Sequence, residues 1–143
     1  MPDTPPTETK TAPGSRTKAR KAALDILFEA DLRGLPIADV LAQTDERGEP
    51  VVRPYTREIV SGVADGLTAV DGTIAAHLPD GWTLGRMPRV DRNLARIAVF
   101  ELTQKGLDAG VAISEAVALA AMLSTDESPA FLNGVLGAIV SGG

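Results

Sequence analysis

The chain of 143 residues contains no cysteine, which excludes disulfides, thiol nucleophiles and thiolate metal ligands. Aromatic side chains are also few, with three Phe, one Tyr and one Trp. This scarcity disfavours the aromatic platforms of many single-strand-binding proteins. No apolar run approaches the roughly 20 residues needed to span a bilayer, and the first residues, MPDTPP, lack the pattern of a signal sequence. We therefore expect a cytoplasmic protein without membrane contact.

Positive charge is concentrated near the start of this acidic chain. The formal net charge is −5, yet residues 15–21 (SRTKARK) contain Arg16, Lys18, Arg20 and Lys21 and no acid. Cations in the first turn of a helix oppose the helix dipole by about 0.3–1 kcal/mol, and a bound polyanion would reverse that effect. This basic cluster therefore predicts contacts with phosphates, which attract a nucleic acid but do not select its sequence. The alternative is a solvated helix start.

Apolar spacing predicts an all-α protein of six to seven helices in one domain. Residues 1–14, rich in Pro and Thr, are expected to form a disordered N-terminal arm, and residues 15–143 the helical domain. The first helix is predicted to begin at a Ser15 cap and to close at Gly34. Further helices are predicted over 37–43, over 59–78 with a break at Asp71-Gly72, from Pro88 to Lys105, over 113–123 and from Ser128 to Val140.

Catalytic chemistry has little support in this sequence. His77 is the one histidine, and a catalytic histidine needs a nucleophile and an orienting acid within reach. Asp80 is close in sequence, but no serine occupies a nucleophile-elbow pattern, so we interpret His77 as a surface residue or a structural hydrogen-bonder. No glycine-rich loop matches a phosphate-binding motif. We expect no enzymatic activity, no cofactor and no metal site.

A second group of cations occurs in the predicted helix that starts near Pro88; it comprises Arg86, Arg89, Arg92 and Arg96. The last three share one helix face, and Asp91 lies beside them. A solvated face with local ion pairs and a partner-binding surface explain this pattern equally well. Glu101 lies one turn after Ile97 on the inward face, which predicts a partly buried acid paired with an arginine.

Four segments of the chain, in order, resemble the NusB family of transcription antitermination factors. They are the ARxxALxxLF pattern at 19–28, YTREIVSGV at 55–63, VDRNLARIAVFEL at 90–102, and the C-terminal pair VAISEAVALAA at 111–121 with SPAFLNGVLG at 128–137. The resemblance covers about residues 16–140. Ser114, Gly137 and Thr17 depart from residues that are frequent in the family.

This resemblance implies two small packed helical bundles that bind the boxA segment of ribosomal RNA transcripts. The partners that it implies are ribosomal protein NusE and an RNA polymerase antitermination complex with other Nus factors. The matching positions in the RNA-binding surface are Arg16, Lys18, Arg20, Lys21, Glu127 and Phe131. Asp91, Arg92 and Glu101 match the region implicated in partner contact.

Two other functions stay open on the sequence alone. NusB-like domains also target RNA in ribosomal RNA cytosine methyltransferases, although this chain has no Cys or cofactor loop for methyl transfer. A helical protein-interaction module without an antitermination role is the other alternative. A homodimer that masks the RNA site is compatible with the sequence as well.

Overall fold

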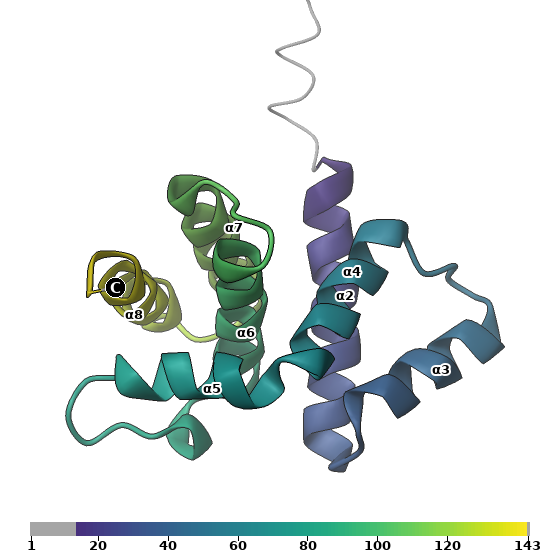
Figure 1. Ribbon diagram of the computed structural model, residues 1–143, viewed down its shortest axis with the longest axis horizontal. Coiled ribbons are helices and arrows are strands. Elements are labelled where there is room, and N and C mark those ends of the chain that lie inside the picture. The colour runs from purple at the N-terminus through teal and green to yellow at the C-terminus, as the bar shows by residue number, and fades with distance from the viewer. Residues whose placement is uncertain (1–13, 143) are drawn as a thin grey trace, which may run out of the picture.

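The computed structural model describes residues 14–142, which form seven α-helices, one 3₁₀ turn and no strand. The helices are α2 (Ser15–Arg33), α3 (Ile37–Arg47), α4 (Pro54–Asp65), α5 (Leu67–Ala76), α6 (Arg89–Thr103), α7 (Ala109–Leu123) and α8 (Ser128–Gly142) (Figure 1). The 3₁₀ turn, η1, spans Leu84–Arg86. The all-α prediction is confirmed, whereas the predicted N-terminal arm falls, apart from Gly14, outside the described residues.

The first bundle consists of α2, α3 and α4. Gly14, rather than the predicted Ser15, occupies the N-cap of α2, and the helix ends as predicted at Gly34, whose φ of 68° is the left-handed conformation that glycine adopts readily. The Gly34 amide donates to the carbonyl of Ala30. Helix α3 extends to Arg47, beyond the predicted end at residue 43. It packs mainly on α2 and α4, on the side away from α7 and α8 (Figure 1).

The long apolar stripe after Pro54 breaks at Gly66. This residue ends α4 and begins α5, and the two helices bend by 78°. The predicted break at Asp71-Gly72 is wrong, because Gly72 lies inside α5. Within residues 14–142 no single helix is long and apolar enough to cross a membrane; α4 and α5 meet that criterion of length and composition only together, as a bent pair.

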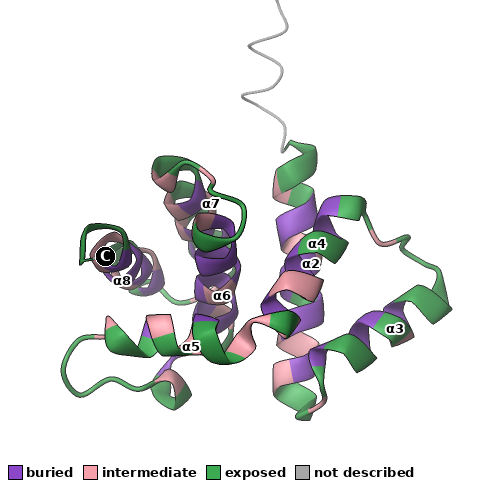
Figure 2. Ribbon diagram, in the orientation of Figure 1, coloured by how far each residue is buried: buried purple, intermediate pink, exposed green. Residues whose placement is uncertain are grey.

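Helix α6 is the centre of the molecule. It packs against α2 and α4 of the first bundle and against α5, α7 and α8, which form the second. Ten of its 15 residues are buried, and Figure 2 shows buried residues along most of its length. Four of the ten are polar or charged: Asp91, Arg92, Asn93 and Glu101. Buried charges need partners, and these partners join α6 to the elements around it.

Helices α4 and α6 approach closely at Gly62. A Cβ atom built there would lie 2.0 Å from Cε1 of Phe100, closer than atoms can pack. Phe100 is itself 5% exposed. Glycine at this position therefore allows the Phe100 ring to lie against the backbone of α4.

Candidate nucleic-acid interface

The basic cluster does not form one surface, because the helix distributes its four side chains around α2. With 3.6 residues per turn, Arg16 and Arg20 share one side of α2, whereas Lys18 and Lys21 lie on another. Arg16, Lys18 and Lys21 reach the surface, but Arg20 is only 4% exposed. The four predicted phosphate contacts are thus divided into two exposed groups with a buried residue between them.

Arg20 lies in the interior, between the two bundles. Its Nε donates to Oε2 of Glu101 at 2.8 Å, and Nη1 lies 3.2 Å from Oε1 of Glu115 on α7. Glu115 also accepts a hydrogen bond from the hydroxyl of Thr17 at 2.9 Å. The prediction of a buried acid paired with an arginine is confirmed at Glu101, which is 1% exposed. Arg20, predicted to contact a phosphate, is instead buried, because both acids draw its guanidinium inward.

Tyr55 joins this buried pair to the surface. Its hydroxyl donates to Oε2 of Glu101 at 2.5 Å, and burial together with this hydrogen bond raises the pKa of Tyr55 to about 12. Cζ of Arg16 lies 4.0 Å from the centre of the Tyr55 ring, and Nζ of Lys105 lies 5.9 Å from it. Both distances are within the range of cation–π attraction. Neither Tyr55 nor Lys105 carries a functional signal in the sequence, since the contact between them depends on the fold.

Lys18 and Lys21 border a groove of about 390 Å³ between α2, the loop before α4, and α7. Arg53 adds a third cation to its rim, and Asp25, paired with Lys21 at 3.0 Å, is the acid there. Two strongly exposed apolar side chains, Val51 and Met122, line the walls. We call this feature the Lys18–Lys21 groove; it combines positive charge with an apolar lining.

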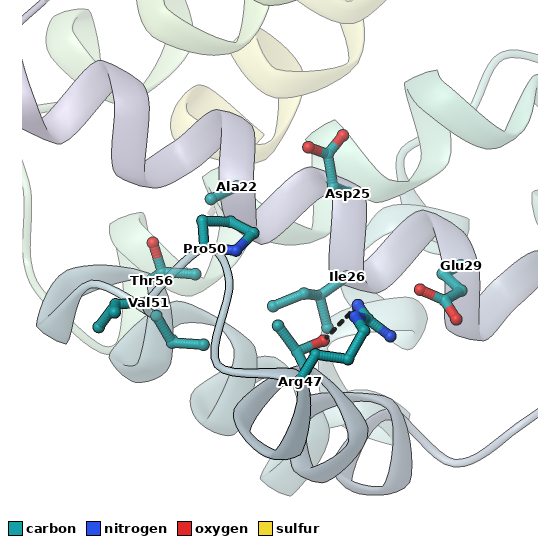
Figure 3. A pocket seen from close by; sticks show the side chains of 10 residues that line it. Ala22, Asp25, Ile26, Glu29, Arg47, Pro50, Val51 and Thr56 are labelled. Carbon is teal, nitrogen blue, oxygen red and sulfur yellow. Dashed lines mark hydrogen bonds between the residues drawn. The ribbon is translucent and has the colours of Figure 1, made fainter.

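The neighbouring pocket between α2 and α3 has different chemistry (Figure 3). Its volume is about 200 Å³, and its charged lining consists of Asp25, Glu29 and Arg47. Nη2 of Arg47 lies 3.4 Å from Oγ1 of Thr44, to which it donates. Two carboxylates beside one cation do not favour an anion, so this pocket is not part of the candidate interface.

An aromatic surface lies at the start of α8. The rings of Phe131 and Trp82 are 4.9 Å apart at an interplanar angle of 50°, and the Arg86 guanidinium lies 5.7 Å from the Trp82 ring centre. With Glu127 and Thr125 these rings border a cavity of about 400 Å³. We call it the Phe131–Trp82 surface. The structure thus brings the predicted residues Glu127 and Phe131 together and adds Trp82, whose signal in the sequence is a lone Trp directly after the Pro79-Asp80-Gly81 turn.

Asp91 and Arg92, predicted to contact a partner, are buried like Glu101. The hydroxyls of Ser124 and Ser128 donate to the two oxygens of Asp91 at 2.5 and 2.8 Å, which fixes the turn between α7 and α8. Arg92 donates to Asp31 on α2 and to the backbone carbonyl of Leu84. The expectation of direct contact through these three side chains is corrected here, since their polar atoms serve bonds within the chain.

The other arginines of α6 also make tertiary ion pairs. Arg96 pairs with Asp71 on α5 at 2.8 Å and lies 3.5 Å from Asp31. Arg89, more exposed, lies 3.9 Å from Asp31. The explanation by a solvated face with local ion pairs therefore holds only in part: ion pairs form, but they are tertiary, with partners on α2 and α5, and Arg92 and Arg96 are largely buried. His77 is a structural hydrogen-bonder as predicted, with Nδ1 2.8 Å from the carbonyl oxygen of Thr73.

Arg16 and Phe131 are supported from opposite ends of α6. Glu101 and its partners support Arg16 at one end, and Asp91 holds the turn before Phe131 at the other. Glu101 follows Asp91 by ten positions in the helix, which corresponds to about 15 Å along the axis.

Comparison with known proteins places this arrangement in a family. The model of the NusB family matches residues 17–141. The transcription antitermination protein NusB of Salinispora tropica is 58% identical over 129 residues, covering 87% of this chain and 94% of the relative. Its counterpart from Arthrobacter sp. (strain FB24) is 52% identical over 124 residues, covering 86% and 90%.

Solved structures show the same relationship. NusB of T. maritima superposes with a TM-score of 0.77 at 30% identity, covering 90% of this chain and 92% of that one. A crystal structure of the antitermination factors NusB and NusE in complex with dsRNA gives a TM-score of 0.77 at 26% identity, covering 90% and 97%. On the sequence match, the shared helical fold and this degree of identity, the chain belongs to the NusB family.

Proposed function

We propose that the protein is a transcription antitermination factor that binds the boxA segment of ribosomal RNA transcripts together with ribosomal protein NusE. It acts in the cytoplasm within an RNA polymerase complex that contains other Nus factors, and it catalyses no reaction. The observation that carries the proposal is the pair of surfaces, one cationic and one aromatic, spaced along α6 of a NusB-family fold. The related antitermination factors NusB and NusE in complex with dsRNA support the same function.

The cationic surface supplies attraction to the RNA backbone. Arg16, Lys18 and Lys21 are accessible, and each neutralised phosphate releases counterions, which makes binding salt-dependent. Arg20 contributes indirectly, since its bond to Glu101 holds the end of α2 that presents the other three cations. These contacts position the strand and leave its sequence unread.

The Phe131–Trp82 surface supplies contacts to bases. Unpaired bases of RNA are recognised by stacking on aromatic rings and by hydrogen bonds to their edges. Phe131 and Trp82 offer the rings. The exposed carboxylate of Glu127 offers an acceptor for an exocyclic amino group of a base.

NusE is expected to increase the affinity of the complex for RNA by adding a second set of contacts. A weak RNA contact and a protein contact joined in one assembly bind more tightly than either does alone. Asp91, Arg92 and Glu101 act in this proposal through the position of α6 and its neighbours, because their side chains are buried.

A gel-shift experiment with boxA RNA and a scrambled RNA of equal length, each with and without NusE, tests the function. The proposal predicts preferential binding of boxA RNA, strengthened by NusE. A protein-interaction module without an RNA role would bind neither RNA preferentially in either condition, and that result would overturn the proposal.

A further inference from the structure

Besides the buried Arg20, two cations from distant parts of the chain lie near the ring of Tyr55. Arg16 comes from the first turn of α2, and Lys105 comes from the turn that follows α6. Their charged groups lie 4.0 and 5.9 Å from the ring centre. The basic cluster at 15–21 therefore extends, through Tyr55, to a residue that lies outside it in sequence.

The stacked position of Arg16 suits it for binding a phosphate. A guanidinium held over an aromatic ring by cation–π attraction does not need its N–H groups as donors to a carboxylate there, so they stay available for other acceptors. Those N–H groups bind phosphate oxygens in a bidentate manner. Lys105 adds a point charge on a flexible stem, 5.9 Å from the centre of the same ring.

Tyr55 has the rigidity that such a platform needs. Its side chain is 8% exposed, and its hydroxyl is bonded to Glu101, which is held in turn by Arg20. The position of the ring is therefore restrained by its hydrogen bond to Glu101, which is itself paired with Arg20. Tyr55 is a positioning residue, because it touches Arg16 and not the RNA.

Glu58 opposes binding at Lys105. Its Oε1 lies 2.7 Å from Nζ of Lys105, and the two side chains are 51% and 35% exposed. Exposed ion pairs of this kind are weak, since water and salt screen them. A phosphate can replace the carboxylate, but Glu58 competes with it for Lys105.

We propose that Arg16 and Lys105 form a subsite for one phosphate group of the RNA backbone, with Tyr55 positioning Arg16 and Glu58 acting as an internal competitor. The proposal rests on the RNA-binding function above and extends it by naming three residues outside the basic cluster. Because a phosphate subsite does not distinguish bases, it acts equally on boxA RNA and on scrambled RNA.

The test measures the affinity of the full chain for fluorescent boxA and scrambled RNA over a range of salt concentrations. Lys105→Gln and Arg16→Gln each lower the affinity for both RNAs several-fold and reduce the salt slope by about 0.7, the value for one phosphate on a single strand. The double variant loses less than the sum of the two effects on log affinity, because both cations serve one phosphate.

Tyr55 and Glu58 provide the more selective variants. Tyr55→Leu removes the ring, matches Arg16→Gln and adds nothing in the Arg16→Gln background. Glu58→Gln increases the affinity. Its matched control is Asp45→Asn, which changes the net charge equally but releases Arg57 and leaves the affinity nearly unchanged.

Circular dichroism of each variant confirms that it is folded, and the surface variants at Lys105 and Glu58 keep the test decisive if Tyr55→Leu unfolds. Unchanged affinity in both Lys105→Gln and Glu58→Gln overturns the subsite. Equal gains in Glu58→Gln and Asp45→Asn overturn it as well, since the effect would then come from net charge. Loss of boxA preference in the unmodified chain would instead contradict the proposed function, while the scrambled RNA would still report on the subsite.

Discussion

Nε of Arg20 lies 2.8 Å from Oε2 of Glu101, and the two side chains are 5% and 1% exposed. This ion pair joins α2 of the first bundle to α6, the central helix. The same carboxylate oxygen accepts a hydrogen bond from the hydroxyl of Tyr55. Glu101 thus has two roles: it links the two bundles through Arg20, and it positions the Tyr55 ring over which Arg16 lies.

Replacing Arg20 with Ala is predicted to lower the free energy of unfolding by about 3–5 kcal/mol, because Glu101 would keep a buried charge without its cation. Urea denaturation followed by circular dichroism measures this change. Lys21→Ala is the control: its ion pair with Asp25 is exposed, and the change should stay within about 0.5 kcal/mol. Similar small effects for both variants would show that the Arg20 pair does not stabilise the fold.

Gly62→Ala is predicted to destabilise the protein by about 1–3 kcal/mol, since the new methyl group would overlap the Phe100 ring and force it to shift. Gly72→Ala serves as the matched control in the neighbouring helix. A Cβ at Gly72 has no neighbour within 4 Å, and Ala favours a helix over Gly by about 1 kcal/mol. Thermal unfolding should therefore move in opposite directions for the two variants, and a shared direction would contradict the packing described here.

Alkaline pH is predicted to destabilise the fold through Tyr55. The pKa of this residue rises from 10 to about 12 in the folded protein because of burial and its hydrogen bond to Glu101. Between these values the unfolded chain has lost the phenol proton and the folded chain still holds it. Since the unfolded state then binds fewer protons, the free energy of unfolding decreases as the pH rises above 10.

The contribution of Tyr55 is measured as the difference between the unmodified chain and Tyr55→Phe, because lysine titration affects both equally. Urea denaturation from pH 8 to pH 11 should show a steeper loss of stability above pH 10 in the unmodified chain. Parallel curves would mean that the hydroxyl is not held in its protonated form by the fold.

Phe131→Leu is predicted to weaken boxA binding without altering its salt dependence. Leucine keeps the apolar contact with Trp82 but offers no ring for stacking, and stacking contributes about 1–3 kcal/mol per base, equivalent to about 5- to 150-fold in affinity. Lys18→Gln provides the contrast, since it should reduce the salt slope by about 0.7. Unchanged affinity in Phe131→Leu would remove the Phe131–Trp82 surface from the RNA site.

Local patterns in the sequence predicted most of the helices but misplaced one break. Gly62, Gly66 and Gly72 look alike along the apolar stripe, and each lowers helix propensity similarly. Their roles differ only through tertiary packing, since Gly62 meets Phe100 on α6 and Gly66 forms the bend between α4 and α5. Propensity alone carries no such information.

Charge patterning located the candidate RNA site only in part. It found Arg16, Lys18 and Lys21, which are accessible, but it gave Arg20 the same role because its partner Glu101 lies 81 residues away. The inward spacing of Glu101 predicted a buried acid and an arginine partner without identifying which arginine. The roles of Tyr55 and Trp82 could not be predicted for a similar reason. The fold brings Arg16 to the ring of Tyr55 and Phe131 to the ring of Trp82.

The central claim is that this chain binds boxA RNA cooperatively with NusE. Fluorescence anisotropy titrations at fixed salt, with boxA and scrambled RNA in the absence and presence of saturating NusE, test it most directly. The account predicts tighter binding of boxA than of scrambled RNA, and a preference that increases when NusE is present. Equal affinity for the two RNAs in both conditions would contradict it.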